Sequence, residues 1–362
     1  MQSKQSTSQP TPARAAENVR KLIDQSQNIL VLCSRPSDID SYGTGAALGW
    51  YLEQLGKTPT VATRFKIEAR EQKHACVGGI VELHDLTQEE FHKKVLSFDL
   101  VISVDSSSWH MVLGENYEYL LEQLLRKQSI AHIDHHQPGN IVDTIPKYCV
   151  HKLSSCTAYV LYEFFIKPSQ YKPPATVAQW LYEALITDTG RYKYNINAKT
   201  MRFAGELIDL GADHDAAVNT DTMLDELKFL SWGIQHTEFV PELRCSFLIA
   251  DERKSPELVK NIGDDWDEYM TMYKSFVMRT VEGYDYGIII SYRDDETNTD
   301  KTYKVSWRTR NYGPTVEMKE VFIAAGLDAG GHRNAGGATY EGDVDELVRR
   351  LKEELRVALQ RF

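Results

Sequence analysis

Short apolar runs alternate with amphipathic stretches over the first two-thirds of the chain. Each run predicts a buried strand, and each stretch with apolar residues at helical spacing predicts a helix. The predicted strands are residues 28–33, 58–63, 100–104 and 129–133. The predicted helices are residues 15–26, 45–55, 116–127, 156–166, 176–186 and 199–209. This order is typical of an α/β domain with a parallel sheet and helices on both faces.

The pattern changes after about residue 211, where a connecting helix is predicted over residues 221–238. The strands predicted beyond it are residues 245–250, 286–292 and 303–308, and the polar run 293–301 predicts a solvated hairpin loop. We therefore expect a second, smaller α+β domain. The expected divisions are a disordered tail (1–14), an α/β catalytic domain (15–211), a helical linker (212–238) and a substrate-binding domain (239–362).

Composition narrows the range of partners. The 41 basic and 52 acidic residues give a formal net charge of −11, which disfavours a broad nonspecific duplex-binding face but leaves room for a short polyanion. The five cysteines form no CxxC pair, which indicates reduced thiols. No apolar run is long enough to cross a bilayer, and the start of the chain lacks the apolar centre of a signal peptide. We expect a cytoplasmic protein with no membrane partner.

Acidic and imidazole residues follow the predicted strands. Asp38 and Asp40 follow the first, Asp105 follows the run 100–104, and the sequence Asp-His-His follows the run 129–133. The carboxyl ends of parallel strands form the ligand-binding edge of such a sheet. Several carboxylates meeting there require a compensating cation. Oxygen and imidazole ligands favour Mn²⁺ or Mg²⁺, and two such ions about 3.5–4 Å apart are a standard device for phosphoester hydrolysis.

Ordered motifs resemble the DHH phosphoesterase family with its DHH-associated C-terminal domain. IDHH (133–136) matches the signature, SDIDSYGT (37–44) resembles the first motif, VDSSS (104–108) the second and TDTG (187–190) the fourth. GGHRNAGG (330–337) and VSWRT (305–309) resemble motifs of the associated domain. The resemblance spans roughly residues 20–350, and it implies a metal-dependent phosphoesterase.

The resemblance implies a set of metal ligands. Asp38 would bind one ion and Asp40 the other, with Asp105 bridging the two ions. His135 and Asp188 would complete the second site. The implied cofactor is Mn²⁺ at two sites, with Mg²⁺ as the alternative.

The resemblance also implies catalytic and substrate-binding residues. His136 would face the scissile phosphate, and Asp134 would orient its neighbour. In the C-terminal domain, a substrate phosphate would be held by Arg308, Gly330, Gly331 and His332.

One departure concerns the first metal site. The family usually has a histidine four positions before the first Asp of motif I, and this chain has Ser34 there. Ser37 also replaces a proline. Exonuclease members resembling RecJ lack the same histidine and remain nucleases. We therefore expect a weakened first site and a stronger dependence of activity on metal concentration.

Two further segments have more than one interpretation. Ser154, Ser155 and Thr157 precede the helical stretch 159–165, and they either cap it or bind phosphate at its N-terminus. The glycines of residues 330–337 form either a tight turn or a phosphate-binding nest, and the basic residues among them favour the nest.

The resemblance points to the branch that degrades very short oligoribonucleotides and removes the 3′-phosphate of 3′-phosphoadenosine 5′-phosphate. One alternative is a phosphodiesterase of cyclic or linear signalling dinucleotides. Another is a nucleotide-binding protein whose first metal site is impaired, as Ser34 suggests. The expected partner is a short nucleic acid or nucleotide. The apolar helix faces leave room for a homodimer.

Overall fold

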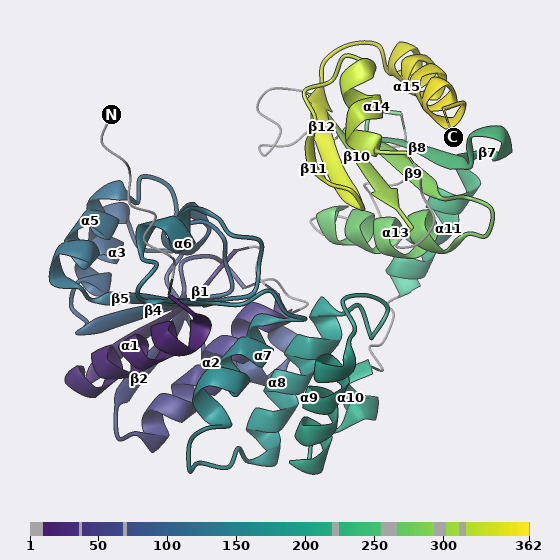
Figure 1. The fold of residues 1–362 in the computed structure, drawn as a ribbon. Coiled ribbons are helices and arrows are strands. Elements are labelled where there is room, and N and C mark those ends of the chain that lie inside the picture. Colours follow the sequence, from purple (N-terminus) through teal and green to yellow (C-terminus); the bar gives the residue numbers. More distant parts are fainter. Residues whose placement is uncertain are drawn as a thin grey trace. The chain divides into compact units, whose positions relative to one another are not determined.

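The chain forms two compact units, Met1–Thr220 and Asp221–Phe362, in the computed structural model (Figure 1). The structure describes residues 10–35, 38–67, 71–218, 224–254, 266–292, 302–310 and 316–361. Ser37 and the predicted hairpin loop at 293–301 lie outside these residues. Each unit is built on a six-stranded sheet of its own. Among the described helices, none combines the length and hydrophobicity that a membrane span needs.

The sheet of the first unit is entirely parallel, with the order β3-β2-β1-β4-β5-β6. Its strands are β1 (Asn28–Cys33), β2 (Thr58–Thr63), β3 (Val81–Glu82), β4 (Leu100–Val104), β5 (Ile130–Asp134) and β6 (Cys149–His151). The strand order reverses between β1 and β4, so the carboxyl ends of these two neighbours border the crevice where such sheets bind ligands.

Helices cover both faces of this sheet (Figure 1). One face packs against α1 (Pro12–Gln25), α2 (Ile39–Gln54) and α7 (Thr157–Leu161). Helix α8 (Ala175–Asp188) packs on α2 and α7, and α9 (Ala198–Asp209) and α10 (His214–Val218) pack on α8. The other face packs against α3 (Gln88–Val95), α4 (His110–Leu113), α5 (Glu118–Lys127) and α6 (Asn140–Thr144). Alternate residues of each strand enter the two cores, as the pleat requires. The predicted fold class is confirmed.

Two helices begin earlier than their apolar periodicity indicates. Helix α2 starts at Ile39 rather than at residue 45, because the Asp38 side chain accepts a hydrogen bond from the backbone N–H of Ser41 and caps the helix. Helix α1 starts at Pro12, within the predicted disordered tail, because Thr11 caps it and proline suits the first helical turn.

The second unit has a mixed sheet with the order β11-β12-β10-β9-β8-β7, in which only β8 and β9 are parallel. Its strands are β7 (Thr237–Val240), β8 (Cys245–Asp251), β9 (Tyr286–Tyr292), β10 (Tyr303–Thr309), β11 (Gly330–His332) and β12 (Ala335–Tyr340). Residues 237 and 238, expected in the connecting helix, therefore belong to β7.

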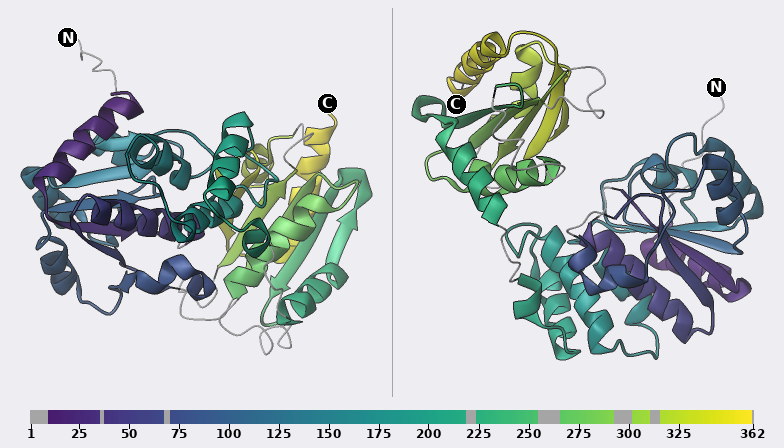
Figure 2. Two further views of the ribbon diagram at one scale, coloured as in Figure 1. Left: turned by 90° about the horizontal axis from the view of Figure 1, so that it is seen from below. Right: turned by 180° about the vertical axis from the view of Figure 1, so that it is seen from behind.

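Helices also cover both faces of the second sheet (Figure 2). Helices α11 (Leu224–Gln235) and α13 (Trp266–Thr280) pack on one face, and α14 (Met318–Ala324) and α15 (Val344–Leu359) pack on the other. The described part of this unit is therefore an α+β layer structure with a core on each side of its sheet.

Close packing explains several glycines of the 330–337 segment. A Cβ at Gly336 would lie 2.1 Å from the buried ring of Trp307, and one at Gly337 would lie 2.6 Å from the carbonyl oxygen of Val305. At Gly330, by contrast, a Cβ would meet nothing within 4 Å. Strand pairing of β12 with β10 therefore requires glycine at two of these positions.

We expect Gly336→Ala to destabilise the second unit by about 1–3 kcal/mol, because a methyl group must displace the Trp307 ring. Gly330→Ala is the matched control, since that position has open space. Urea unfolding of the full chain measures both. Equal stability of the two variants would contradict this account of the packing.

Candidate active site

The strands of the first sheet bring the predicted site residues to one edge. Asp38 and Asp40 lie at the start of α2, after β1, and Asp105 directly follows β4. Asp134 is the last residue of β5, so its two following histidines leave the same edge. Asp188 is the last residue of α8.

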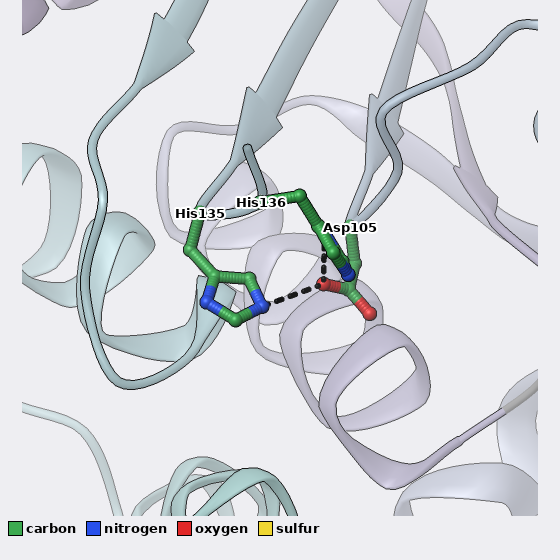
Figure 3. Close-up of side chains that lie close together, drawn as sticks. All are labelled: Asp105, His135 and His136. Carbon is green, nitrogen blue, oxygen red and sulfur yellow. Dashed lines mark ion pairs between the residues drawn. The ribbon is translucent and has the colours of Figure 1, made fainter. Parts of the chain in front are cut away.

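Two groups of side chains could each hold a metal ion. One consists of Asp40, His135 and Asp188, and the other of Asp105, His135 and His136; within each group the ligand atoms lie within 4.8 Å of one another. His135 is common to both. Its Nε2 lies 3.1 Å from Asp188 Oδ2, 3.7 Å from Asp105 Oδ1 and 3.9 Å from Asp40 Oδ2. Figure 3 shows the rings of His135 and His136 approaching the same oxygen of Asp105.

The tautomer of His135 follows from its other nitrogen. Nδ1 lies 3.2 Å from the carbonyl oxygen of Ser154, and a carbonyl can only accept a hydrogen bond. Nδ1–H therefore donates to Ser154, and the neutral ring keeps a lone pair on Nε2. A backbone carbonyl that fixes a ring in this way is the usual support of a metal-binding histidine.

The carboxylates of this edge crowd one another. Burial, and then the charge of a neighbouring carboxylate, raises the pKa of each of four side chains, Asp38, Asp40, Asp105 and Asp188. Ionised together at neutral pH, they require positive charge nearby. The oxygen and nitrogen donors are those that Mn²⁺ and Mg²⁺ accept, so the residues present fit such an ion.

Asp38 stands apart from the two groups. Its charge raises the pKa of Asp105, but its carboxylate is in neither of the two close sets of ligand atoms. One of its oxygens caps α2 through the N–H of Ser41, at 3.0 Å.

Asp134 and His136 form a separate pair. Nδ1 of His136 lies 2.8 Å from Oδ1 of Asp134. Burial disfavours a charged His136 ring, but the hydrogen bond to Asp134 and the charge of Asp105 outweigh it and raise the pKa of His136 to about 9. Asp134 is fully buried, whereas the His136 side chain is 45% exposed. Asp134 therefore holds the His136 ring in a fixed orientation, and the exposed part of the ring is accessible to a substrate.

Asp40 caps α7 from a distant part of the chain. Its Oδ2 accepts a hydrogen bond from the N–H of Thr157 (2.6 Å), and its Oδ1 accepts one from the N–H of Ala158 (3.0 Å). Neither of the two serines before α7 is its cap: the Ser154 hydroxyl donates to the Cys156 carbonyl, and the buried Ser155 hydroxyl accepts none of the N–H groups of the helix. These two N–H groups are therefore occupied by a carboxylate of the protein itself.

Asp105 has a left-handed backbone conformation, with φ of 62°. Its N–H donates to the carbonyl oxygen of Ile133, and its own carbonyl oxygen accepts a hydrogen bond from the Ser34 hydroxyl. The backbone N–H of Ser34 in turn donates to the Ser41 hydroxyl. The buried Ser34 thus fixes the turn that carries Asp105.

His132 supports the neighbouring loop. Its Nε2–H donates to the Ser106 carbonyl at 2.7 Å, and its Nδ1 accepts from the Ser103 hydroxyl at 2.7 Å. Burial lowers the pKa of this ring, which keeps it neutral. His132 therefore supports the site and is not among the candidate ligands.

The second unit brings two arginines to the β11–β12 turn. Arg279 of α13 donates to the carbonyl oxygen of Asn334 at 3.3 Å, and Thr309 donates its backbone N–H to the same oxygen. Burial, and then the charge of Arg279, lowers the pKa of Arg308. Among the described residues no carboxylate forms an ion pair with Arg308. Two neighbouring guanidinium groups favour an anion between them.

Gly330 and Gly331 are exposed in β11, and Gly331 has φ of 130°. For His332 the structure describes the backbone, which ends β11.

The sequence analysis did not predict Thr157 as a carboxylate partner or Arg279 as a neighbour of Arg308. Neither has a local signal, because each contact joins segments far apart in the sequence.

Comparison with known proteins identifies a family match and a shared fold. Residues 28–186 match the DHH family, N-terminal domain. An exopolyphosphatase-related protein from Bacteroides fragilis is 16% identical, with a TM-score of 0.76 over 95% of this chain and 96% of that one. RecJ from Thermus thermophilus, in complex with Mn²⁺, is 15% identical, with a TM-score of 0.51 over 97% of this chain and 55% of RecJ.

Residues 28–186, which lie in the first unit, are therefore similar to a DHH-family N-terminal domain. Likeness to the two solved structures extends the shared fold over nearly the whole chain, although the chain spans about half the length of RecJ.

We expect Asp188→Asn to raise the unfolding midpoint of the metal-free protein at pH 8 by roughly 2–4 °C, or about 1 kcal/mol, because it removes one of the crowded charges. Added Mn²⁺ should stabilise the wild type more than the variant, since the ion binds the native state. Differential scanning fluorimetry with EDTA or Mn²⁺ measures both. Asp143→Asn, at an exposed acid on α6, is the control, and a lower midpoint for metal-free Asp188→Asn would contradict the prediction.

Proposed function

We propose that this chain is a divalent-metal-dependent phosphoesterase that hydrolyses very short oligoribonucleotides and 3′-phosphoadenosine 5′-phosphate. The observation that carries the proposal is the convergence of buried carboxylates on the Nε2 lone pair of His135. The DHH-family match supports the reaction class, and the Mn²⁺ in the RecJ structure supports the choice of ion.

The proposed metal ligands are Asp38, Asp40, Asp105, His135 and Asp188, with Asp105 between the two ions. Bound divalent cations would supply Lewis acidity, neutralise phosphoryl oxygens and activate water. His136 keeps Nε2 for the substrate, because its Nδ1 bonds Asp134. We assign to His136 a contact with the scissile phosphate, and to Asp134 the orientation of that ring. The carbonyl oxygen of Ser154 orients His135. We assign to Ser155 a contact with the substrate.

The second unit is proposed to bind a terminal phosphate. Arg308 and Arg279 supply two guanidinium groups, and the exposed backbone at Gly330 and Gly331, with His332, completes the proposed anion site. A phosphomonoester carries close to two negative charges at neutral pH, which suits a pair of arginines. 3′-Phosphoadenosine 5′-phosphate carries such groups, and an oligoribonucleotide carries one where its end is phosphorylated. The net charge of −11 disfavours long polyanions.

A second candidate is a nucleotide-binding protein with an impaired first metal site. The observation that favours it is that the Ser34 hydroxyl bonds the Asp105 backbone, while Asp38 lies in neither close group of ligand atoms. Hydrolysis of a cyclic or linear signalling dinucleotide is the remaining alternative within the enzyme class.

The decisive measurement is product analysis with 5′-labelled oligoribonucleotides of increasing length, 3′-phosphoadenosine 5′-phosphate and signalling dinucleotides, each with Mn²⁺ or EDTA. We expect mononucleotides from the shortest oligomers and adenosine 5′-phosphate from the bisphosphate, with Mn²⁺ only. Asp105→Asn should lower kcat at least about 100-fold, because it removes charge at the reacting centre. Binding of nucleotide without turnover at millimolar Mn²⁺ would favour the binding protein.

Arg308→Ala and Arg279→Ala should each raise KM by roughly 10–100-fold for substrates with a terminal phosphate, the loss expected for a charge-assisted hydrogen bond. The effect should disappear with substrates that lack that phosphate. Arg349→Ala, an exposed arginine of α15 paired with Glu353, is the control. If KM is unchanged in both variants, the second unit does not bind the terminal phosphate through these arginines. That result would not contradict the proposed metal site of the first unit.

A further inference from the structure

Thr157 contacts both groups of metal-ligand candidates. It is the first residue of α7 and is fully buried. Its hydroxyl donates to Asp105 Oδ1 at 2.7 Å, and its backbone N–H donates to Asp40 Oδ2 at 2.6 Å. One residue therefore holds a carboxylate from each group.

The two oxygens that Thr157 holds also lie close to His135. Asp105 Oδ1 lies 3.7 Å and Asp40 Oδ2 lies 3.9 Å from Nε2 of that ring. A carboxylate oxygen has two lone-pair sites, so it can accept one hydrogen bond and still face a cation. The bonds to Thr157 restrict the rotation of both carboxylates and leave sites for an ion.

The two bonds differ in what they require of the side chain. Any residue other than proline supplies the N–H that bonds Asp40. The bond to Asp105 needs a hydroxyl on Cβ, which Thr and Ser provide and Val does not. The buried position also matters, because a hydrogen bond to a charged group away from water has more effect than one in solvent.

We propose that Thr157 is a positioning residue that fixes the orientation of Asp105 relative to Asp40 for divalent-cation binding. The proposal rests on the metal-dependent function proposed above. A purely structural threonine at the start of a helix would contribute to stability and leave metal affinity unchanged. Metal affinity therefore separates the two explanations.

The test is calorimetric titration of Mn²⁺ into metal-stripped full-length protein, with no substrate present. Thr157→Val keeps the shape and removes the hydroxyl, and we expect its Kd for Mn²⁺ to rise roughly 10–100-fold, the usual effect of losing a group that orients a metal ligand. Thr157→Ser should remain close to wild type. Thr200→Val, at a buried threonine of α9, is the matched control and should bind Mn²⁺ as the wild type does.

A double variant tests whether Thr157 affects Mn²⁺ affinity through Asp105. Adding Thr157→Val to Asp105→Asn should cause no further loss of Mn²⁺ affinity, because the hydroxyl acts through Asp105. Circular dichroism checks that each variant is folded, and Thr157→Ala replaces Thr157→Val if the latter is not.

Three results would overturn the proposal while leaving the metal site intact. They are unchanged Mn²⁺ affinity in Thr157→Val, an equal loss in Thr157→Ser, and an equal loss in Thr200→Val. A wild-type protein that binds no Mn²⁺ at millimolar concentration would instead overturn the metal-dependent function, and the positioning role with it.

Discussion

Repulsion among buried carboxylates is the constraint on which the first unit depends. Asp40, Asp105 and Asp188 come from three different elements and lie around one imidazole nitrogen. Burial alone disfavours each charge, and proximity disfavours all of them together. The fold tolerates the arrangement because N–H and hydroxyl donors hold the oxygens in place. The native state is therefore organised for a cation.

Helix α7 is central to that organisation. Its first two N–H groups bond Asp40, and the partial positive charge of a helix N-terminus stabilises a carboxylate there. The same helix start provides the hydroxyl that bonds Asp105. The chain thus uses a helix terminus, which elsewhere binds ligand phosphates, to hold one of its own buried carboxylates. Substrate anions must then be bound by other groups.

The sequence predicts seven of the twelve strands that the structure describes, because those seven are continuous apolar runs bounded by polar residues. It misses β3, β6, β7, β11 and β12, which are short or glycine-rich. Strands β1, β2, β4 and β9 have the predicted bounds. It predicts the starts of helices less well, as α2 shows, because Asp38 could equally be a cap or a ligand. Ser154 and Ser155 were assigned as cap or phosphate contact, whereas the cap comes from Asp40, 117 residues away from Thr157 in sequence. Such contacts have no local pattern.

The left-handed backbone at Asp105 restricts which residues can replace it. Asparagine and aspartate adopt this conformation far more readily than β-branched or bulky residues, and glycine adopts it freely. Asparagine therefore changes the charge and little else, whereas alanine also strains the turn that Ser34 fixes. The backbone of this turn therefore accepts few residues other than aspartate, asparagine and glycine, whatever the side chain does in the site.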